Sequence, residues 1–220
     1  MVKFCAGQPV KQADIRDCPI HTGQKQEHYD SRNSSYKPSS GYKTSFYQKL
    51  PMVSSNNEIT NTFIFTKHKK LNKETDMVGK ASIYFSTVNS IDDSDVRISK
   101  RLNVPSYRLR GFERGKVGPK DGSDFIGGNY ATSFNFSSTL PSFFENSENI
   151  DFLFFIDAAN VWGVDYSSSI NDGSKLRSSF GLGIDWLTPI GPLNFTFAET
   201  ITKADSDITE NFRFNLGTTF

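Results

Sequence analysis

Hydrophobic and polar residues alternate along the last twelve residues of the chain. One face of this segment carries Glu210, Phe212, Phe214, Leu216, Thr218 and Phe220, and the other carries Asn211, Arg213, Asn215, Gly217 and Thr219. Successive side chains of a strand point to opposite faces, so the pattern predicts a strand with one apolar and one polar face. A final strand that is apolar outside, polar inside and ends on an aromatic residue is typical of a transmembrane β-barrel.

The same alternation recurs in seven earlier segments, separated by turns or loops. They lie at about 42–50, 59–67, 78–88, 128–138, 149–162, 176–186 and from 193 onward. In the segment 149–162, Ile150, Phe152, Phe154 and Ile156 face one way, and Asp151, Leu153, Phe155 and Asp157 face the other. In 59–67, Phe63 and Phe65 oppose Ile64, so its faces are less distinct. We therefore predict an all-β fold, an antiparallel transmembrane β-barrel with about eight recognisable strands.

A soluble β-sandwich is the main alternative fold for such a pattern. Strands of about nine to twelve residues fit a membrane span better than the usual soluble strand of about five or six residues. The chain has 20 Phe, yet only 36% of its residues are hydrophobic and its mean hydropathy is negative. This composition is typical of a barrel with an apolar exterior and a water-filled interior. No apolar run of about 18 residues is present, which excludes a transmembrane helix but does not bear on a barrel.

The N-terminal residues 1–27 are polar and irregular, and residues 29–41 resemble a turn region. The first eight residues contain no apolar core of a secretory signal, although a bacterial outer-membrane protein needs one. Either the barrel interpretation is wrong or this chain is a piece of something longer. Cys5 and Cys18, the two cysteines, could form a disulfide or remain free thiols, and they do not complete a metal-ligand spacing.

Charge and residue spacing exclude several classes of function. The net charge of +1 gives no reason to expect nucleic-acid binding. The three histidines are scattered, and no nucleophile–base pair or phosphate-binding loop is present. We therefore expect neither an enzyme nor a bound cofactor or metal.

Several short motifs together resemble a known family. The chain contains Arg108-Leu109-Arg110-Gly111-Phe112, then Gly127-Gly128-Asn129, then Phe155-Ile156-Asp157-Ala158-Ala159, and finally a hairpin sequence between Trp186 and Phe195. Their order and spacing over residues 28–220 resemble the barrel of the BamA-type bacterial surface antigen family of outer-membrane assembly factors. The resemblance covers about the C-terminal half of such a barrel.

The resemblance implies a barrel of about sixteen strands preceded by POTRA domains. It also implies that the segment 89–126 is an external loop that folds back into the lumen, with Arg110, Gly111 and Phe112 as its lumen motif. Arginine in a polar lumen prefers a carboxylate partner, and Asp157 faces inward by the alternation above. Two positions depart from the family pattern: Ala159 replaces a glycine, and Ser137 stands near a position that is usually acidic.

The function that the resemblance implies is assembly and insertion of β-barrel proteins in the bacterial cell outer membrane. Its partners would be outer-membrane lipids, unfolded outer-membrane proteins and assembly-complex lipoproteins. In the family, an open seam between the first and last strands templates incoming strands by edge pairing. Here Phe212, Phe214, Leu216 and Phe220 mark the last strand, but no first strand is recognisable, so we expect no assembly activity from this chain in isolation.

The alternative is a small closed outer-membrane barrel of eight strands with a structural or surface-antigen role. Eight strands can close, but the interior is then filled by side chains and leaves little room for a long loop. Pairing of the segment 42–50 with the last strand would favour the small barrel, and two unpaired edges would favour part of a larger one.

Overall fold

One curved antiparallel sheet dominates the computed structural model. The structure describes the backbone of residues 2–5 and 8–11, and residues 23–51, 58–72, 74, 77–92, 94–141, 149–172, 174–189 and 191–217. The sheet has eleven strands in the order β13-β12-β11-β10-β9-β6-β5-β4-β3-β1-β2. Every neighbouring pair is antiparallel, so the all-β antiparallel fold is confirmed. Among the described residues, no helix is both long and apolar enough to cross a membrane.

The strands agree closely with the alternating segments, apart from the two ends of the sheet. They are β1 (Val2–Cys5), β2 (Gln8–Lys11), β3 (Gln24–Asp30), β4 (Gly41–Lys49), β5 (Glu58–Lys70), β6 (Val78–Ser90), β9 (Tyr130–Thr139), β10 (Ile150–Trp162), β11 (Arg177–Thr188), β12 (Gly191–Thr202) and β13 (Phe212–Leu216). A short hairpin, β7 (Lys120–Asp121) and β8 (Asp124–Phe125), and the single-turn helix η1 (Ile98–Lys100) lie between β6 and β9.

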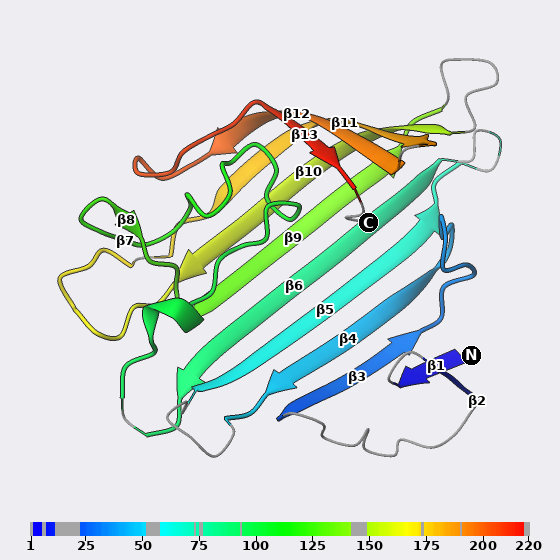
Figure 1. Ribbon diagram of the computed structural model, residues 1–220. Helices are drawn as coiled ribbons and strands as arrows, with labels where there is room; N and C mark the ends of the chain where they lie inside the picture. The colour runs from blue at the N-terminus through cyan, green and yellow to red at the C-terminus, as the bar shows by residue number, and fades with distance from the viewer. Residues whose placement is uncertain are drawn as a thin grey trace.

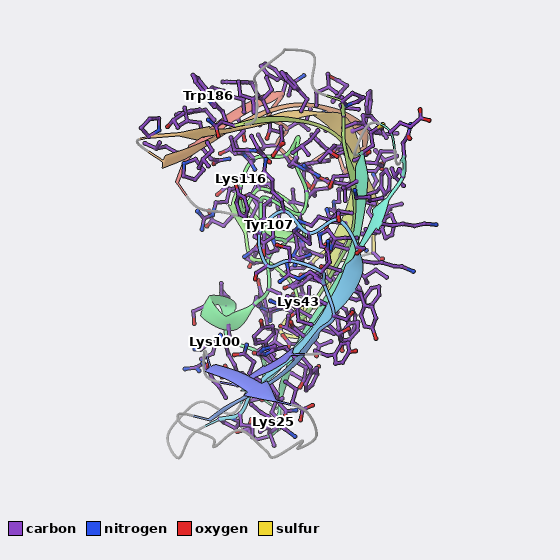
Figure 2. The ribbon with its side chains drawn as sticks, turned by 90° about the vertical axis from the view of Figure 1, so that its right-hand side faces the viewer. Lys25, Lys43, Lys100, Tyr107, Lys116 and Trp186 are labelled. Atoms are coloured by element: carbon purple, nitrogen blue, oxygen red, sulfur yellow. The ribbon has the colours of Figure 1, made fainter. Side chains whose placement is uncertain are left out.

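The sheet bends into an open trough, so that it has a convex and a concave face (Figure 2). Trp186 lies on the convex face, whereas Tyr107 and Lys116 lie inside the curve (Figure 2). Large apolar side chains are exposed on the convex face: Tyr42, Phe63, Ile83, Phe85, Phe134, Ile156, Phe180, Leu182, Trp186, Phe197, Phe212, Phe214 and Leu216. The inward positions of the same strands are mostly small or polar, which is the distribution of a lipid-facing sheet with a polar interior.

The N-terminal boundary of the sheet differs from the prediction. Residues 2–5 and 8–11, predicted to be irregular, form β1 and β2. Residues 24–27 of the same predicted segment, together with Tyr29 and Asp30, which were predicted to lie in a turn, belong to β3. This strand pairs with β4 from Gln24 opposite Lys49 to Asp30 opposite Lys43. Its sequence, Gln-Lys-Gln-Glu-His-Tyr-Asp, has no apolar face, so its strand character is visible only through pairing with β4.

The C-terminal strand begins later than the predicted segment 209–220. Strand β13 covers Phe212–Leu216, and residues 209–211 belong to the connection before it. Phe220 and the side chains of Cys5 and Cys18 lie outside the residues that the structure describes. Within the described residues the sheet does not close, because β4 pairs with β3 and β5 whereas β13 pairs with β12. The closed eight-strand barrel is therefore not the arrangement found.

The connection between β6 and β9, here called the long loop (residues 91–129), lies against the concave face (Figure 1). It supplies Val104, Leu109, Phe112 and Val117 to a buried apolar cluster. The strands supply Tyr84, Ala131, Ala159 and Val161 to the same cluster. Ile64 packs against the cluster from β5, which settles the faces of that strand: Ile64 points inward and the exposed Phe63 points outward. The core of the molecule is thus formed between this loop and the sheet.

Candidate functional site

The long loop is anchored to the sheet by an ion pair between Arg110 and Asp157 of β10. Nε of Arg110 donates to Oδ2 of Asp157 at 2.7 Å, and Nη2 donates to Oδ1 at 2.9 Å. The backbone N–H of Arg110 adds a bond of 3.1 Å to Oδ2. The Asp157 side chain is fully buried and that of Arg110 is 18% exposed. The two side chains therefore form a bidentate, charge-assisted pair, the stronger type of arginine–carboxylate contact.

Asn135 and Phe155 also contact this ion pair. Asn135, opposite Asp157 in the register of β9 and β10, donates to Oδ1 of Asp157 at 2.8 Å. The same amide nitrogen donates to the backbone carbonyl of Arg108 at 2.6 Å. Phe155 lies two residues before Asp157 on the same face, and Cζ of Arg110 is 3.5 Å from the centroid of its ring. The buried carboxylate thus accepts four hydrogen bonds, which offsets the cost of removing its charge from water.

Gly111 lets the long loop approach the sheet closely. Its φ of +87° is a conformation that residues with a Cβ rarely adopt. A Cβ at this position would lie 3.1 Å from Cβ of Ala198 and 3.2 Å from Cβ of Ser179. The Ser179 hydroxyl donates a short hydrogen bond to the carbonyl of Arg110. The backbone conformation therefore favours glycine here, and a Cβ would be in tight contact with β11 and β12.

Phe112 is the apolar anchor of the long loop and is only 1% exposed. Its backbone forms a bridge with Thr209, in the connection between β12 and β13. Hydrogen bonds from Glu113 N to Ile208 O at 2.9 Å and from Glu210 N to Gly111 O at 3.1 Å continue this pairing. The predicted lumen motif therefore contacts both the middle of the sheet and the segment that leads into the last strand.

Two further arginine–aspartate pairs hold the loops, one buried on both sides and one with a partly exposed aspartate, and the alternation pattern did not predict either. Arg177 of β11 donates to Asp207 at 2.9 and 3.2 Å, and the side chains are 4% and 0% exposed. Asp207 also accepts the backbone N–H of Gly118 at 3.4 Å, which ties the 203–211 connection to the long loop. The inward position of Arg177 was predictable from alternation, but no sequence pattern indicated Asp207 as its partner.

The second of these pairs joins Arg101 to Asp165, at the end of the trough that carries the loops. Asp165 also accepts hydrogen bonds from Val96 N at 3.0 Å and from Asn129 Nδ2 at 2.8 Å. Burial raises the pKa of the Asp165 carboxyl, but the hydrogen bonds from Val96, Asn129 and Arg101 outweigh it and hold that pKa below its ordinary value. Asp165 is therefore charged at neutral pH and bound by three donors.

The two positions that depart from the family pattern, Ala159 and Ser137, lie on neighbouring strands β10 and β9. Ala159 is 1% exposed and belongs to the apolar cluster, where its methyl group is accommodated. Ser137 lies opposite Lys80 and Phe155 in the register of β9. Among the described residues, Asp157 is the carboxylate that pairs with Arg110, and no group of His, Cys, Asp and Glu side chains there could hold a metal ion.

The last strand forms one edge of the described sheet. Its register with β12 runs from Phe212 opposite Phe197 to Leu216 opposite Leu193. Phe212, Phe214 and Leu216 all point to the convex face and are about half exposed. Ring centroids lie 5.0 Å apart for Phe197 and Phe212, and 5.1 Å apart for Phe195 and Phe214. The predicted seam residues within the described part of the chain thus form an apolar surface at the sheet edge.

Comparison with known proteins places this arrangement in a family. The chain is 30% identical over 139 residues to the outer membrane protein assembly factor BamA of Neisseria meningitidis, which covers 51% of this chain and 17% of that protein. It is 27% identical over 160 residues to a SAM50-like protein of Schizosaccharomyces pombe, covering 68% of this chain and 33% of the relative.

A solved structure has the same fold. The crystal structure of BamA from Haemophilus ducreyi lacking POTRA domains 1–3 matches with a TM-score of 0.79 and 26% identity, over 87% of this chain and 41% of that one. The chain therefore spans less than half the length of each of these relatives. A family model described as the Omp85 superfamily domain matches residues 23–220. Because this match includes the whole sheet from β3 to β13, the chain belongs to the Omp85 superfamily.

Proposed function

We propose that this chain supplies the seam-carrying part of a machine that assembles and inserts outer-membrane β-barrel proteins. Membership of the superfamily makes it an outer-membrane β-barrel protein and gives it no enzymatic role. The observation that carries the proposal is the edge strand β13, which pairs with β12 on one side and is bonded through Arg213 to the long loop on the concave face. Unfolded outer-membrane proteins would be its clients, and assembly-complex lipoproteins would be partners.

The physical basis is the hydrogen-bonding capacity of a strand edge. A strand with one neighbour presents N–H and C=O groups that can pair with another strand. In this scheme the concave face becomes the lumen and the convex face meets lipid. We propose that further strands, beyond those described here, complete the barrel around the long loop, because the solved relative continues over more than twice the matched length.

A proline on the free edge tests the proposal. Ala198 N donates to Asn211 O and Gly217 N donates to Pro192 O, so odd-numbered residues of β13 bond to β12. In antiparallel pairing the intervening residue Phe214 directs its N–H to the free edge. Phe214→Pro removes that donor and leaves pairing with β12, whereas Phe214→Leu keeps the donor and an apolar side chain.

The assay is recovery of outer-membrane protein assembly in cells depleted of their own assembly factor. The matched section of the Neisseria meningitidis relative would be replaced by residues 23–220 of this chain. We expect the native and Phe214→Leu chimeras to restore assembly and Phe214→Pro to lose most of it. Equal recovery with Phe214→Pro and Phe214→Leu would contradict use of this edge.

A further inference from the structure

Arg213 is the inward-facing residue in the middle of β13, and it holds the long loop rather than the sheet. Its Nη1 donates to the carbonyl of Ser106 at 3.0 Å, and its Nη2 donates to the carbonyl of Phe112 at 2.6 Å. Both acceptors lie about a hundred residues away in the sequence, within the long loop. The side chain is 15% exposed, so these bonds form largely out of water.

Glu210 fixes the orientation of the guanidinium. Its Oε2 accepts from Nε of Arg213 at 3.2 Å and from Nη2 at 2.8 Å. Glu210 N in turn donates to Gly111 O at 3.1 Å, so this residue is itself attached to the long loop. Arginine suits the position because its planar group carries five donors in a fixed geometry, which can reach two carbonyls and one carboxylate together.

Few other contacts hold the concave side of β13. The strand has five residues, and its other inward side chain, Asn215, reaches Asn194 of β12 at 3.4 Å. Its outward residues contact β12 through the Phe195–Phe214 and Phe197–Phe212 ring pairs. Within the described residues, the bonds of Arg213 are thus the side-chain bonds that connect β13 itself to the long loop.

We infer that Arg213 is a positioning residue that couples the edge strand to the long loop. When Arg213 is bound, β13 cannot separate from β12 without giving up bonds to Ser106 and Phe112. Displacement of the loop from the concave face likewise removes a restraint on the edge. Opening of the edge and movement of the loop are therefore linked, and the meaning of this link for assembly rests on the function proposed above.

The direct test is amide hydrogen exchange, followed by mass spectrometry, on the chimeric barrel described above folded into phospholipid vesicles. In Arg213→Gln, we expect exchange of residues 212–216 and 106–112 to accelerate about tenfold, as expected for loss of hydrogen bonds to a charged group. Exchange in β4, β5 and β6 should stay within about twofold. Arg213→Lys, which keeps the charge but has a single ammonium group, should recover part of the protection.

Arg114→Gln is the matched control, because Arg114 is an exposed arginine of the same loop whose side chain forms no hydrogen bond or ion pair with the described residues. It should leave both segments unchanged. Should Arg213→Gln fail to fold, Glu210→Gln tests the same geometry more mildly and should accelerate the same two segments. Acceleration spread evenly over the whole sheet, or unchanged exchange in 212–216, would overturn the inference.

The assembly assay separates this inference from the proposed function. In the chimeric barrel, Arg213→Gln should lower the recovery of assembly relative to Arg114→Gln. A native chimera that fails to assemble clients refutes the proposed function, while the exchange result still decides the coupling. Faster exchange in 212–216 combined with unchanged assembly would refute the part of the inference that links the coupling to assembly.

Discussion

Two segments reach onto the concave face from opposite ends of the strands, and they are held in different ways. The long loop follows β6 at one end, and the turn 31–40 joins β3 to β4 at the other. The long loop buries Phe112 and the Arg110–Asp157 pair. The turn contacts β10 through one ion pair, Lys37 to Asp151 at 2.6 Å, whose side chains are 46% and 36% exposed.

The two ion pairs differ in solvent exposure and therefore in how much each contributes to stability. The Lys37–Asp151 pair spans three intervening strands, yet both groups remain in contact with solvent. The turn takes its shape locally, since Asn33 Oδ1 accepts the backbone N–H groups of Ser39 and Ser40 at 3.0 Å each. The long loop takes its position from the sheet, through buried charges and an apolar cluster. We therefore expect substitutions in the long loop to cost far more stability than substitutions in the turn.

The largest effect is expected for Asp157→Asn. This change leaves the Arg110 guanidinium without its buried counter-charge and should lower the free energy of unfolding by about 3 kcal/mol. Denaturant unfolding of the chain in detergent micelles, followed by tryptophan fluorescence, measures it. Asp151→Asn is the control, since Asp151 is half-exposed. Equal losses for the two variants would remove the distinction between the two segments.

Gly111→Ala should have the next largest effect. The positive φ alone costs on the order of 1–3 kcal/mol for a residue with a Cβ, and contact with Ala198 and Ser179 adds to it. Gly115→Ala provides a matched control, because Gly115 has φ of +71° but nothing within 4 Å of its Cβ. The difference between the two unfolding free energies isolates the close approach to the sheet. No difference would mean that the loop is not pressed against β11 and β12.

Lys37→Gln should change little. Half-exposed ion pairs contribute about 0–1 kcal/mol, and salt screens them further. The unfolding free energy at low and high salt measures this contribution, which should shrink as salt rises. A loss comparable to that of Asp157→Asn would show that the turn, too, is a principal anchor.

Acidification should produce the smallest effect, confined to the loop end of the trough. The pKa of Asp165 is lower in the folded protein than its ordinary value, so folding is favoured by its charged form. Its contribution is complete above the ordinary carboxyl pKa of about 3.9 and is lost as pH falls through the folded value. Hydrogen exchange of residues 94–101 should therefore rise below about pH 4 in the native chain but not in Asp165→Asn. An identical pH response in both proteins would contradict this.

The sequence predicted the parts of the fold that depend on period-two alternation. It placed Asp157 and Phe155 inward and Phe212 and Phe214 outward, because β10 and β13 carry large apolar residues on the opposite face from their charged residues. It did not predict β3, whose residues are polar on both faces. It also missed Arg177–Asp207 and the bonds of Arg213 to the long loop, because these contacts join segments far apart in the sequence. Such pairings depend on how the loops lie over the sheet, which alternation does not determine.

The most direct test of the account is a double-mutant cycle on the Arg110–Asp157 pair. Arg110→Gln, Asp157→Asn and the double variant would be unfolded under identical conditions in detergent micelles. If the pair anchors the long loop to the concave face, the double variant should lose about 2 kcal/mol less stability than the sum of the single variants. Losses that add to within about 0.5 kcal/mol would show that the two residues do not act together and would contradict the account.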